Sequence, residues 1–202
     1  EADGYYRYAD FDGVEYLQLG AGITQEEFYD DFFSGASFTL VPGQASPQTI
    51  LLSGSSNAST PDFADLTNVS LSQEWIDNGH VFYIRCFHGN DTIIGMDGHG
   101  DSIVGDSDNN ILIGQGGADT ITLGYDNDTL LYDDPSQGGD LIHDFYHPED
   151  ELAFVSANFD NLPLGTLDPA EFTSVAGFVD ATSGPEHFVF DTATNQLIYN
   201  PD

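Results

Sequence analysis

The stretch that decides the fold runs from His88 to Tyr132 and reads HGNDTIIGMDGHGDSIVGDSDNNILIGQGGADTITLGYDNDTLLY. Asp or Asn returns in it every nine or ten residues, usually just ahead of an apolar pair. These marker residues are Asp91, Asp101, Asn110, Asp119 and Asp128. A nonapeptide of the form G-G-x-G-x-D-x-U-x, in which U is a large apolar residue, is the calcium-binding repeat of parallel β-helical proteins. The spacing therefore predicts a stacked, metal-binding repeat.

Each part of the repeat has a physical role. Glycine adopts positive φ without steric cost, so the Gly-rich half of a repeat turns tightly and directs backbone carbonyl oxygens toward one point. The Asp adds a hard anionic oxygen, which suits calcium. The triplets that follow the markers read TII, SIV, ILI, TIT and TLL, and we expect each to form a short strand with its central residue inside. One such turn cannot bury its apolar residue alone, so several must stack.

These repeats resemble those of the repeats-in-toxin (RTX) calcium-binding proteins, and the resemblance runs from about Cys86 to the end of the chain. It implies an all-β fold, in which a parallel β-roll is followed by a C-terminal β cap and preceded by a β-rich N-terminal region. In that family two nonapeptides make one turn, so loops on the same side come from repeats two apart. Each calcium ion is expected between two such loops, and several ions are expected in all.

The resemblance also implies which residues bind calcium. Carried over residue by residue, it sets Gly89 and Asp91 against Gly105, Ser107 and Asn110; Gly98 and Asp101 against Gly114, Gly116 and Asp119; Asp106, Asp108 and Asn110 against Asp128; and Gly117 and Asp119 against Asp140.

Three departures from the repeat bear on these sites. The step from Asp91 to Asp101 is ten residues long, so the insertion at His99-Gly100 is expected to distort the second site. Asn110 replaces an Asp; its side-chain carbonyl can still bind calcium, with lower affinity because one charge is missing. Where the family usually has small residues, this chain has further candidate ligands that either bind calcium directly or crowd the loops, namely Asp106, Asp108 and Asp126.

Composition agrees with calcium binding. The chain has 35 acidic residues against Arg7 and Arg85 alone, which gives a formal net charge of −33. Such a chain repels nucleic acid, and its folded state should need divalent cations or high salt. Residues 86 to 145 contain twelve Asp and no Glu, which suits metal binding from within tight loops. The alternative is an acidic, halophile-like surface without bound metal.

The chain divides into three regions. Residues 1–62 form an aromatic N-terminal region of unknown role, residues 63–145 the roll with its repeats at 86–134, and residues 146–202 the cap. In the first region, residues 14–19 and 37–41 alternate like strands, whereas Thr24 followed by Glu27 predicts the start of a short helix over 24–33. In the cap, we expect a hairpin whose turn is residues 191–195.

Enzyme signatures do not occur in the sequence. The six His residues include no H-E-x-x-H motif, and there is no G-x-S-x-G motif. The single cysteine, Cys86, adjoins an apolar run and is expected to be buried. We therefore expect a protein that is not an enzyme.

The function expected from these features is calcium-driven folding outside the cell. The resemblance implies a secreted or cell-surface bacterial protein that leaves by type I secretion, and we see no signal peptide or transmembrane run. One alternative is a cell-surface adhesin or self-assembling subunit, whose N-terminal region binds a glycan, a peptide or identical subunits. Another is the accessory repeat domain of a larger secreted enzyme.

Overall fold

The computed structural model describes residues 16–18, 25–29, 37–42, 49–54, 61–78, 80–146, 148–159, 165, 172–175, 188–191 and 196–199. Over these residues the regular secondary structure is almost entirely β-strand, which confirms the expected all-β class. The elements are β1 (Tyr16–Gln18), β2 (Gln25–Tyr29), β3 (Phe38–Val41), β4 (Thr49–Ser53), β5 (Phe63–Asp65), β6 (Val69–Leu71), α1 (Gln73–Asp77), β7 (Val81–Arg85), β8 (Thr92–Ile94), β9 (Ser102–Val104), β10 (Ile111–Ile113), β11 (Thr120–Thr122), β12 (Thr129–Tyr132), β13 (Leu141–His143), β14 (Glu151–Phe154), the 3-10 helix η2 (Ser156–Asn158), β15 (Phe172–Val175), β16 (Phe188–Asp191) and β17 (Gln196–Tyr199).

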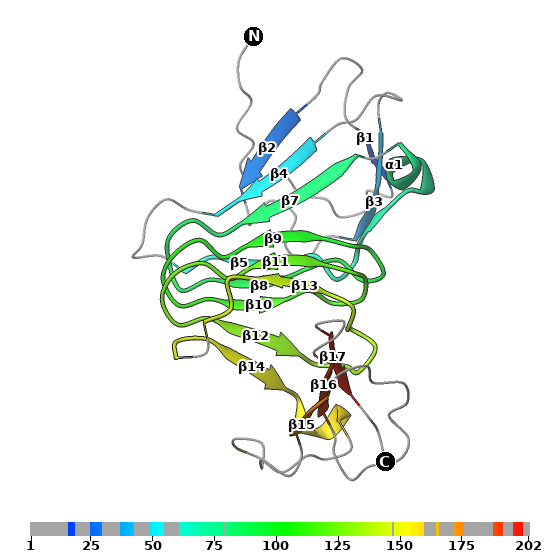
Figure 1. Cartoon of the computed structure of the whole chain (residues 1–202). Coiled ribbons are helices and arrows are strands. Elements are labelled where there is room, and N and C mark those ends of the chain that lie inside the picture. Colours follow the sequence, from blue (N-terminus) through cyan, green and yellow to red (C-terminus); the bar gives the residue numbers. More distant parts are fainter. Residues whose placement is uncertain are drawn as a thin grey trace.

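Two parallel sheets make up the centre of the molecule (Figure 1). One has the strand order β14-β12-β10-β8-β5, and the other has the order β13-β11-β9-β7-β4-β2. From β8 to β14, consecutive strands alternate between the two sheets, so each strand pairs in parallel with the strand two further along the chain. Loops two repeats apart therefore lie next to one another, as the family resemblance implies.

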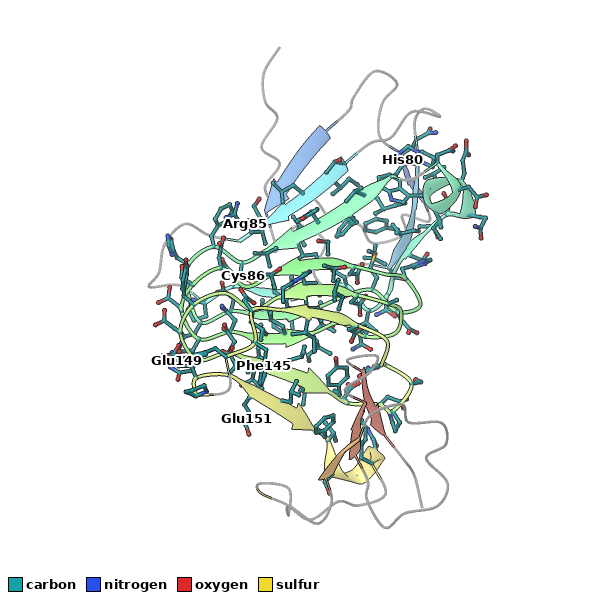
Figure 2. All side chains as sticks on the ribbon, viewed as in Figure 1. His80, Arg85, Cys86, Phe145, Glu149 and Glu151 are labelled. Carbon is teal, nitrogen blue, oxygen red and sulfur yellow. The ribbon has the colours of Figure 1, made fainter. Side chains whose placement is uncertain are left out.

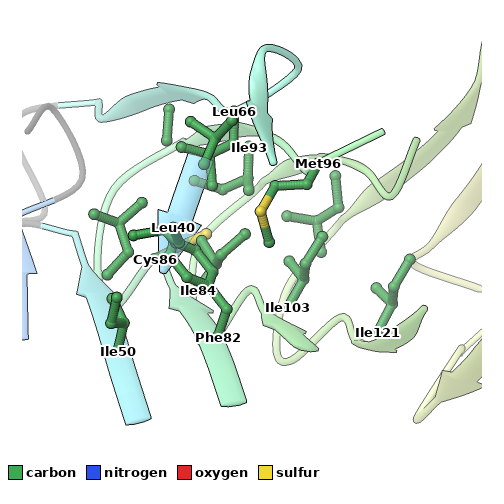
Figure 3. Packing of buried hydrophobic residues seen from close by; sticks show 14 of the residues in the cluster. Leu40, Ile50, Leu66, Phe82, Ile84, Cys86, Ile93, Met96, Ile103 and Ile121 are labelled. Carbon is green, nitrogen blue, oxygen red and sulfur yellow. The ribbon is translucent and has the colours of Figure 1, made fainter. Parts of the chain in front are cut away.

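The central residue of each repeat triplet lies in a row inside the molecule. In one sheet Ile84, Ile103 and Ile121 are register partners on neighbouring strands, and Figure 3 shows them one after another. In the other sheet Ile93 pairs with Leu112, which pairs in turn with Leu130. All six side chains are 0% exposed. Burying such a side chain stabilises the fold by about 1.5–3 kcal/mol, so the two rows are the main apolar support of the loops.

The N-terminal strands extend this arrangement. β2 and β4 precede the boundary expected at residue 62, yet they continue the sheet that contains β7 and β9. β1, β3 and β6 form a further parallel sheet. Phe38 and Leu40 of β3 belong to the same buried cluster as Ile93, which also contains Cys86 as expected. β3 and β4 thus share a core with the repeats.

The helix predicted over residues 24–33 was wrong, because β2 occupies residues 25–29 of that segment as a strand. The spacing of Thr24 and Glu27 is a local signal, and the parallel pairing of five residues with β4 outweighs it. Conversely, α1 was not predicted. Its N-cap is Ser72, whose Oγ accepts a hydrogen bond from Trp75 N at 3.2 Å.

Toward the C-terminus, β14 pairs with β12 and so adds one more strand to the five-stranded sheet. β15, β16 and β17 form a separate sheet, drawn toward the β14 end of the molecule in Figure 1. Its antiparallel pair, β16 and β17, is the hairpin expected around residues 191–195. Among the described residues, no helix has the length and apolar character needed to cross a membrane.

Candidate metal centre

The marker residues stand at the ends of the loops, immediately before the strands. All five are buried, with between 1% and 3% of each residue exposed. Four use the side-chain oxygen Oδ1 to accept a hydrogen bond from a backbone N–H of the turn before. The acceptors are Asp91 from Asp62 N at 2.8 Å, Asn110 from Asp91 N at 3.0 Å, Asp119 from Asp101 N at 2.8 Å and Asp128 from Asn110 N at 2.8 Å. The side chains thereby form two ladders that hold successive turns together.

The other carboxylate oxygen of the interior Asp residues lacks a partner. Four buried oxygens accept no hydrogen bond: Asp91 Oδ2, Asp101 Oδ1, Asp119 Oδ2 and Asp128 Oδ2. A buried ionised oxygen without a donor or a counter-ion costs more than 1–3 kcal/mol, so native proteins rarely leave one in this state. These oxygens identify positions where a cation or a proton is required.

The pKa values of the marker residues are raised for the same reason, the cost of burying an ionised carboxylate without a partner. Burial raises the pKa of Asp91 to about 6, that of Asp119 to about 7 and that of Asp128 to about 6. Burial likewise raises the pKa of Asp101 well above its usual range. Nearby carboxylates add to the shift, since the charge of Asp140 further raises the pKa of Asp119. Positive charge in the loops would favour the ionised form of each group.

At the last turns, protein donors satisfy the corresponding carboxylates. Asp140 Oδ1 accepts from Asp119 N at 3.0 Å, and its Oδ2 accepts from the Tyr132 hydroxyl at 2.8 Å. Asp150 Oδ1 accepts from Asp128 N at 3.1 Å, and its Oδ2 accepts from Tyr146 N at 2.7 Å. Asp140 was predicted to bind calcium, and the structure places it beside Asp119 with both of its oxygens already hydrogen-bonded.

The ten-residue repeat differs from its neighbours, as expected from its length. Asp101 Oδ2 accepts a hydrogen bond from Met96 N of its own loop at 2.6 Å, so its unpartnered oxygen is Oδ1. The longer loop also brings His99 to β6, where its Nε2 accepts a hydrogen bond from Leu71 N at 3.3 Å. His99 is half-buried rather than solvated, and burial lowers its pKa.

The acidic residues at the glycine positions of the repeat make hydrogen bonds between turns. Asp106 binds Arg85 through bonds of 2.6 Å and 3.1 Å, and the Arg85 guanidinium also lies 4.6 Å from the ring centre of Phe87. Figure 2 shows Arg85 at the end of β7. Asp108 Oδ2 accepts from Gly89 N at 3.1 Å, and Asp126 Oδ2 accepts from Asp108 N at 3.3 Å. Their side chains thus bridge neighbouring loops at the surface.

The loop glycines allow the turns to stack closely. Gly117 has a φ of 150°, and a Cβ there would lie 2.0 Å from the carbonyl oxygen of His99 in the adjacent loop. A Cβ on Gly114 would lie 2.2 Å from Asp119 Oδ2, so this oxygen sits directly over the start of its own loop. The remaining predicted residues lie in the same stacked loops. Those residues are Gly89, Gly98, Gly105, Ser107 and Gly116.

Asp62 and Asp150 belong to the ladders although the repeat pattern did not identify them. Each stands directly before a strand, β5 for Asp62 and β14 for Asp150, as Asp91 stands directly before β8. That position is the sequence signal which could have found them. The Gly-rich half of the repeat is missing at both places, and the predicted series therefore ended too early.

Asp126→Gly should stabilise the protein. Asp126 has a φ of 77°, a left-handed conformation that costs a residue with a Cβ about 1 kcal/mol. The hydrogen bond that its side chain accepts from Asp108 N is long, at 3.3 Å, and lies at the surface. The variant should therefore gain about 0.5–1 kcal/mol in free energy of unfolding. Urea denaturation measures the change. Asp126→Ala is the matched control, because it removes the same charge but keeps the Cβ; an Ala variant as stable as the Gly variant would contradict the argument.

In the part of the chain that the structure describes, no three His, Cys, Asp or Glu side chains come close enough to hold a metal ion by themselves. The expected calcium sites differ from such clusters, because they combine side-chain oxygens with backbone carbonyl oxygens of the Gly-rich loops. The aromatic N-terminal residues on which the adhesin alternative depends lie mostly outside the described residues.

Comparisons with models of known protein families, with curated proteins and with solved structures found no match.

Proposed function

We propose that this chain is a calcium-binding extracellular module of the RTX type, in which the two parallel sheets form a β-roll that calcium completes. The observation that carries the proposal is the set of buried carboxylate oxygens without a hydrogen-bond partner, on Asp91, Asp101, Asp119 and Asp128. Asp91, Asp119 and Asp128 leave the same atom, Oδ2, without a partner, whereas Asp101 leaves Oδ1 and Asn110 leaves none. A buried, unpartnered carboxylate that recurs from loop to loop indicates a ligand that repeats with the fold.

The donor set fits calcium. The groups available in these loops are carboxylate and backbone carbonyl oxygens, which are the hard ligands that calcium prefers. Asp91, Asp119 and Asp128 would hold the ions, together with backbone carbonyl oxygens of the loops. When bound, calcium supplies the positive charge that lets these buried carboxylates remain ionised at neutral pH. The protein residues hold the loops in register through the Oδ1 ladder.

Electrostatics couples this binding to folding. The formal net charge of −33 opposes the compact state, and the loops bring carboxylates close together. Binding energy then contributes directly to folding, because the unfolded chain offers no assembled site. In the proposed role the chain stays unfolded where calcium is scarce, passes through a type I exporter, and folds outside a bacterial cell where calcium is abundant.

Circular dichroism and size-exclusion chromatography of the full chain at pH 8 test the proposal. Millimolar calcium should give a β-rich spectrum and a compact elution volume. An excess of chelator should lower the melting temperature below the temperature of these measurements, which expands the protein and reduces its β signal. Magnesium should reverse neither change, because it demands a smaller and more regular coordination shell. A native spectrum that chelator leaves unchanged would contradict calcium-driven folding.

A further inference from the structure

Asn110 is the marker residue whose side chain has no unpartnered polar atom. Its Oδ1 accepts a hydrogen bond from Asp91 N at 3.0 Å, as the Oδ1 atoms of Asp119 and Asp128 accept from the turns before them. Its Nδ2 faces its own loop. There it lies 3.1 Å from Gly105 O, 3.3 Å from Ser107 O and 3.3 Å from Asp108 O.

Three backbone carbonyl oxygens therefore converge on one nitrogen. The amide carries two hydrogens, which three acceptors share, and its partial positive charge lies where a cation would otherwise attract these oxygens. In the neighbouring repeats the equivalent atom is a carboxylate oxygen. Asp119 Oδ2 lies over Gly114 just as Asn110 Nδ2 lies over Gly105, at 2.2 Å and 3.3 Å from the Cβ position of each glycine.

The loop backbones support this equivalence. Asp106 and Asp108 have φ values of 71° and 72°, and the corresponding residues two repeats later, Gly124 and Asp126, have φ values of 111° and 77°. The loop that ends at Asp128 thus turns in the same way as the loop that ends at Asn110. The loop that ends at Asp128 has an unpartnered carboxylate oxygen, Oδ2, whereas the loop that ends at Asn110 has a hydrogen-bond donor, Nδ2, in its place.

We propose that the Asn110 amide takes the place of a calcium ion in the loop of residues 105–110, so that this loop closes without metal. The assignment of calcium to the other loops rests on the proposed function. The expectation that the Asn110 carbonyl oxygen binds calcium is revised accordingly, because that oxygen serves the ladder and the amide serves the loop. The stack then has one turn that needs no calcium ion of its own, with calcium-dependent loops on both sides of it.

Asn110→Asp in the full chain tests the substitution of amide for metal. The Asp keeps the Oδ1 acceptor but turns a carboxylate oxygen toward three carbonyls. In chelator the variant should melt roughly 5–10 °C below the wild type, because a buried charge is left unsatisfied. In calcium it should bind one ion more per chain than the wild type, as counted by isothermal titration calorimetry.

Asp128→Asn is the converse control. It gives a neighbouring loop the amide that Asn110 already has, so it should bind one ion fewer and melt in chelator roughly 5 °C above the wild type. The proposal is overturned if Asn110→Asp melts in chelator at or above the wild-type temperature. It is equally overturned if the wild type binds calcium and Asn110→Asp binds no additional ion.

Failure of the proposed function gives a different result. If the wild type and both variants bind no calcium, the calcium-binding role falls. The order of melting temperatures in chelator still decides whether the amide closes its loop. If Asn110→Asp does not fold in chelator, the gain expected for Asp128→Asn remains a test with a folded protein.

Discussion

In a chelator, the protein should be more stable at pH 5 than at pH 8, with a melting temperature at least about 10 °C higher. The cause is the group of buried marker carboxylates. Burial raises the pKa of Asp91 to about 6, of Asp119 to about 7 and of Asp128 to about 6, each from an ordinary value of 3.8. At a pH between 3.8 and these raised pKa values, the folded state binds more protons than the unfolded state does.

The sign follows from this proton uptake. A carboxyl group whose pKa is raised on folding contributes stability that is fully present below pH 3.8 and is lost as the pH rises through its folded pKa, here between about 6 and 7. His80 and His99 act in the opposite direction. Burial lowers the pKa of each, so their contribution is lost as the pH falls below 6.5. The carboxyl groups outnumber them and set the net direction.

Thermal melts at several pH values, with chelator and with saturating calcium, measure this effect. Calcium binds the ionised carboxylates, so it should remove the loss of stability at pH 8 and reverse the dependence. Asp119→Asn is the control variant, because it keeps an oxygen for the ladder without a titrating group. Its melting temperature in chelator should vary less with pH. A melting temperature in chelator that rises steadily from pH 5 to pH 8 would refute the argument.

Asp119→Ala should weaken calcium-driven folding far more than Asp140→Ala. Asp119 has one oxygen in the ladder and one unpartnered oxygen over its own loop, whereas protein donors hold both oxygens of Asp140. Loss of the Asp119 carboxylate therefore removes a calcium ligand. We expect the calcium concentration at the folding midpoint to rise about tenfold or more in Asp119→Ala and to change less than about threefold in Asp140→Ala.

Behaviour without calcium separates a lost ligand from a lost structural contact. In chelator at pH 8, Asp140→Ala should be destabilised, because Asp119 N and the Tyr132 hydroxyl both lose their acceptor. Asp119→Ala also removes an unsatisfied buried charge, and its net effect in chelator should be smaller. Calcium titrations followed by circular dichroism give both midpoints. Equal midpoints in the two variants would show that Asp119 is no more a ligand than Asp140.

Much of the fold could be predicted because its signals are local and repeated. Ile103 is flanked by half-buried Ser102 and Val104 and is itself fully buried, which the apolar centre of the triplet SIV indicates by itself. The helix expected from Thr24 failed for the opposite reason: one capping pattern, met once, does not outweigh the pairing of β2 with β4. Repetition makes a weak local preference decisive, because each turn supplies the partner that the next turn needs.

The candidate site could be predicted only in outline. The marker spacing identifies which residues stand at the loop ends, and the described structure brings them together in the expected order. The marker spacing does not reveal which side-chain oxygens accept a hydrogen bond from the protein. Asp140 and Asp128 look alike in sequence, yet the Tyr132 hydroxyl reaches Asp140 and nothing donates to Asp128 Oδ2.

The sequence by itself thus determined the period of the stack and the residue of each triplet that is buried, and its resemblance to a known family implied which loops become neighbours. These properties depend on chain spacing and on the apolar surface of a few adjacent residues. Only the tertiary structure decided how each buried carboxylate or amide is satisfied, through Met96 N for Asp101, through loop carbonyls for Asn110 and by no protein group for Asp119 Oδ2. Hydrogen bonding is directional and acts over about 3 Å, so its outcome depends on how neighbouring turns are placed.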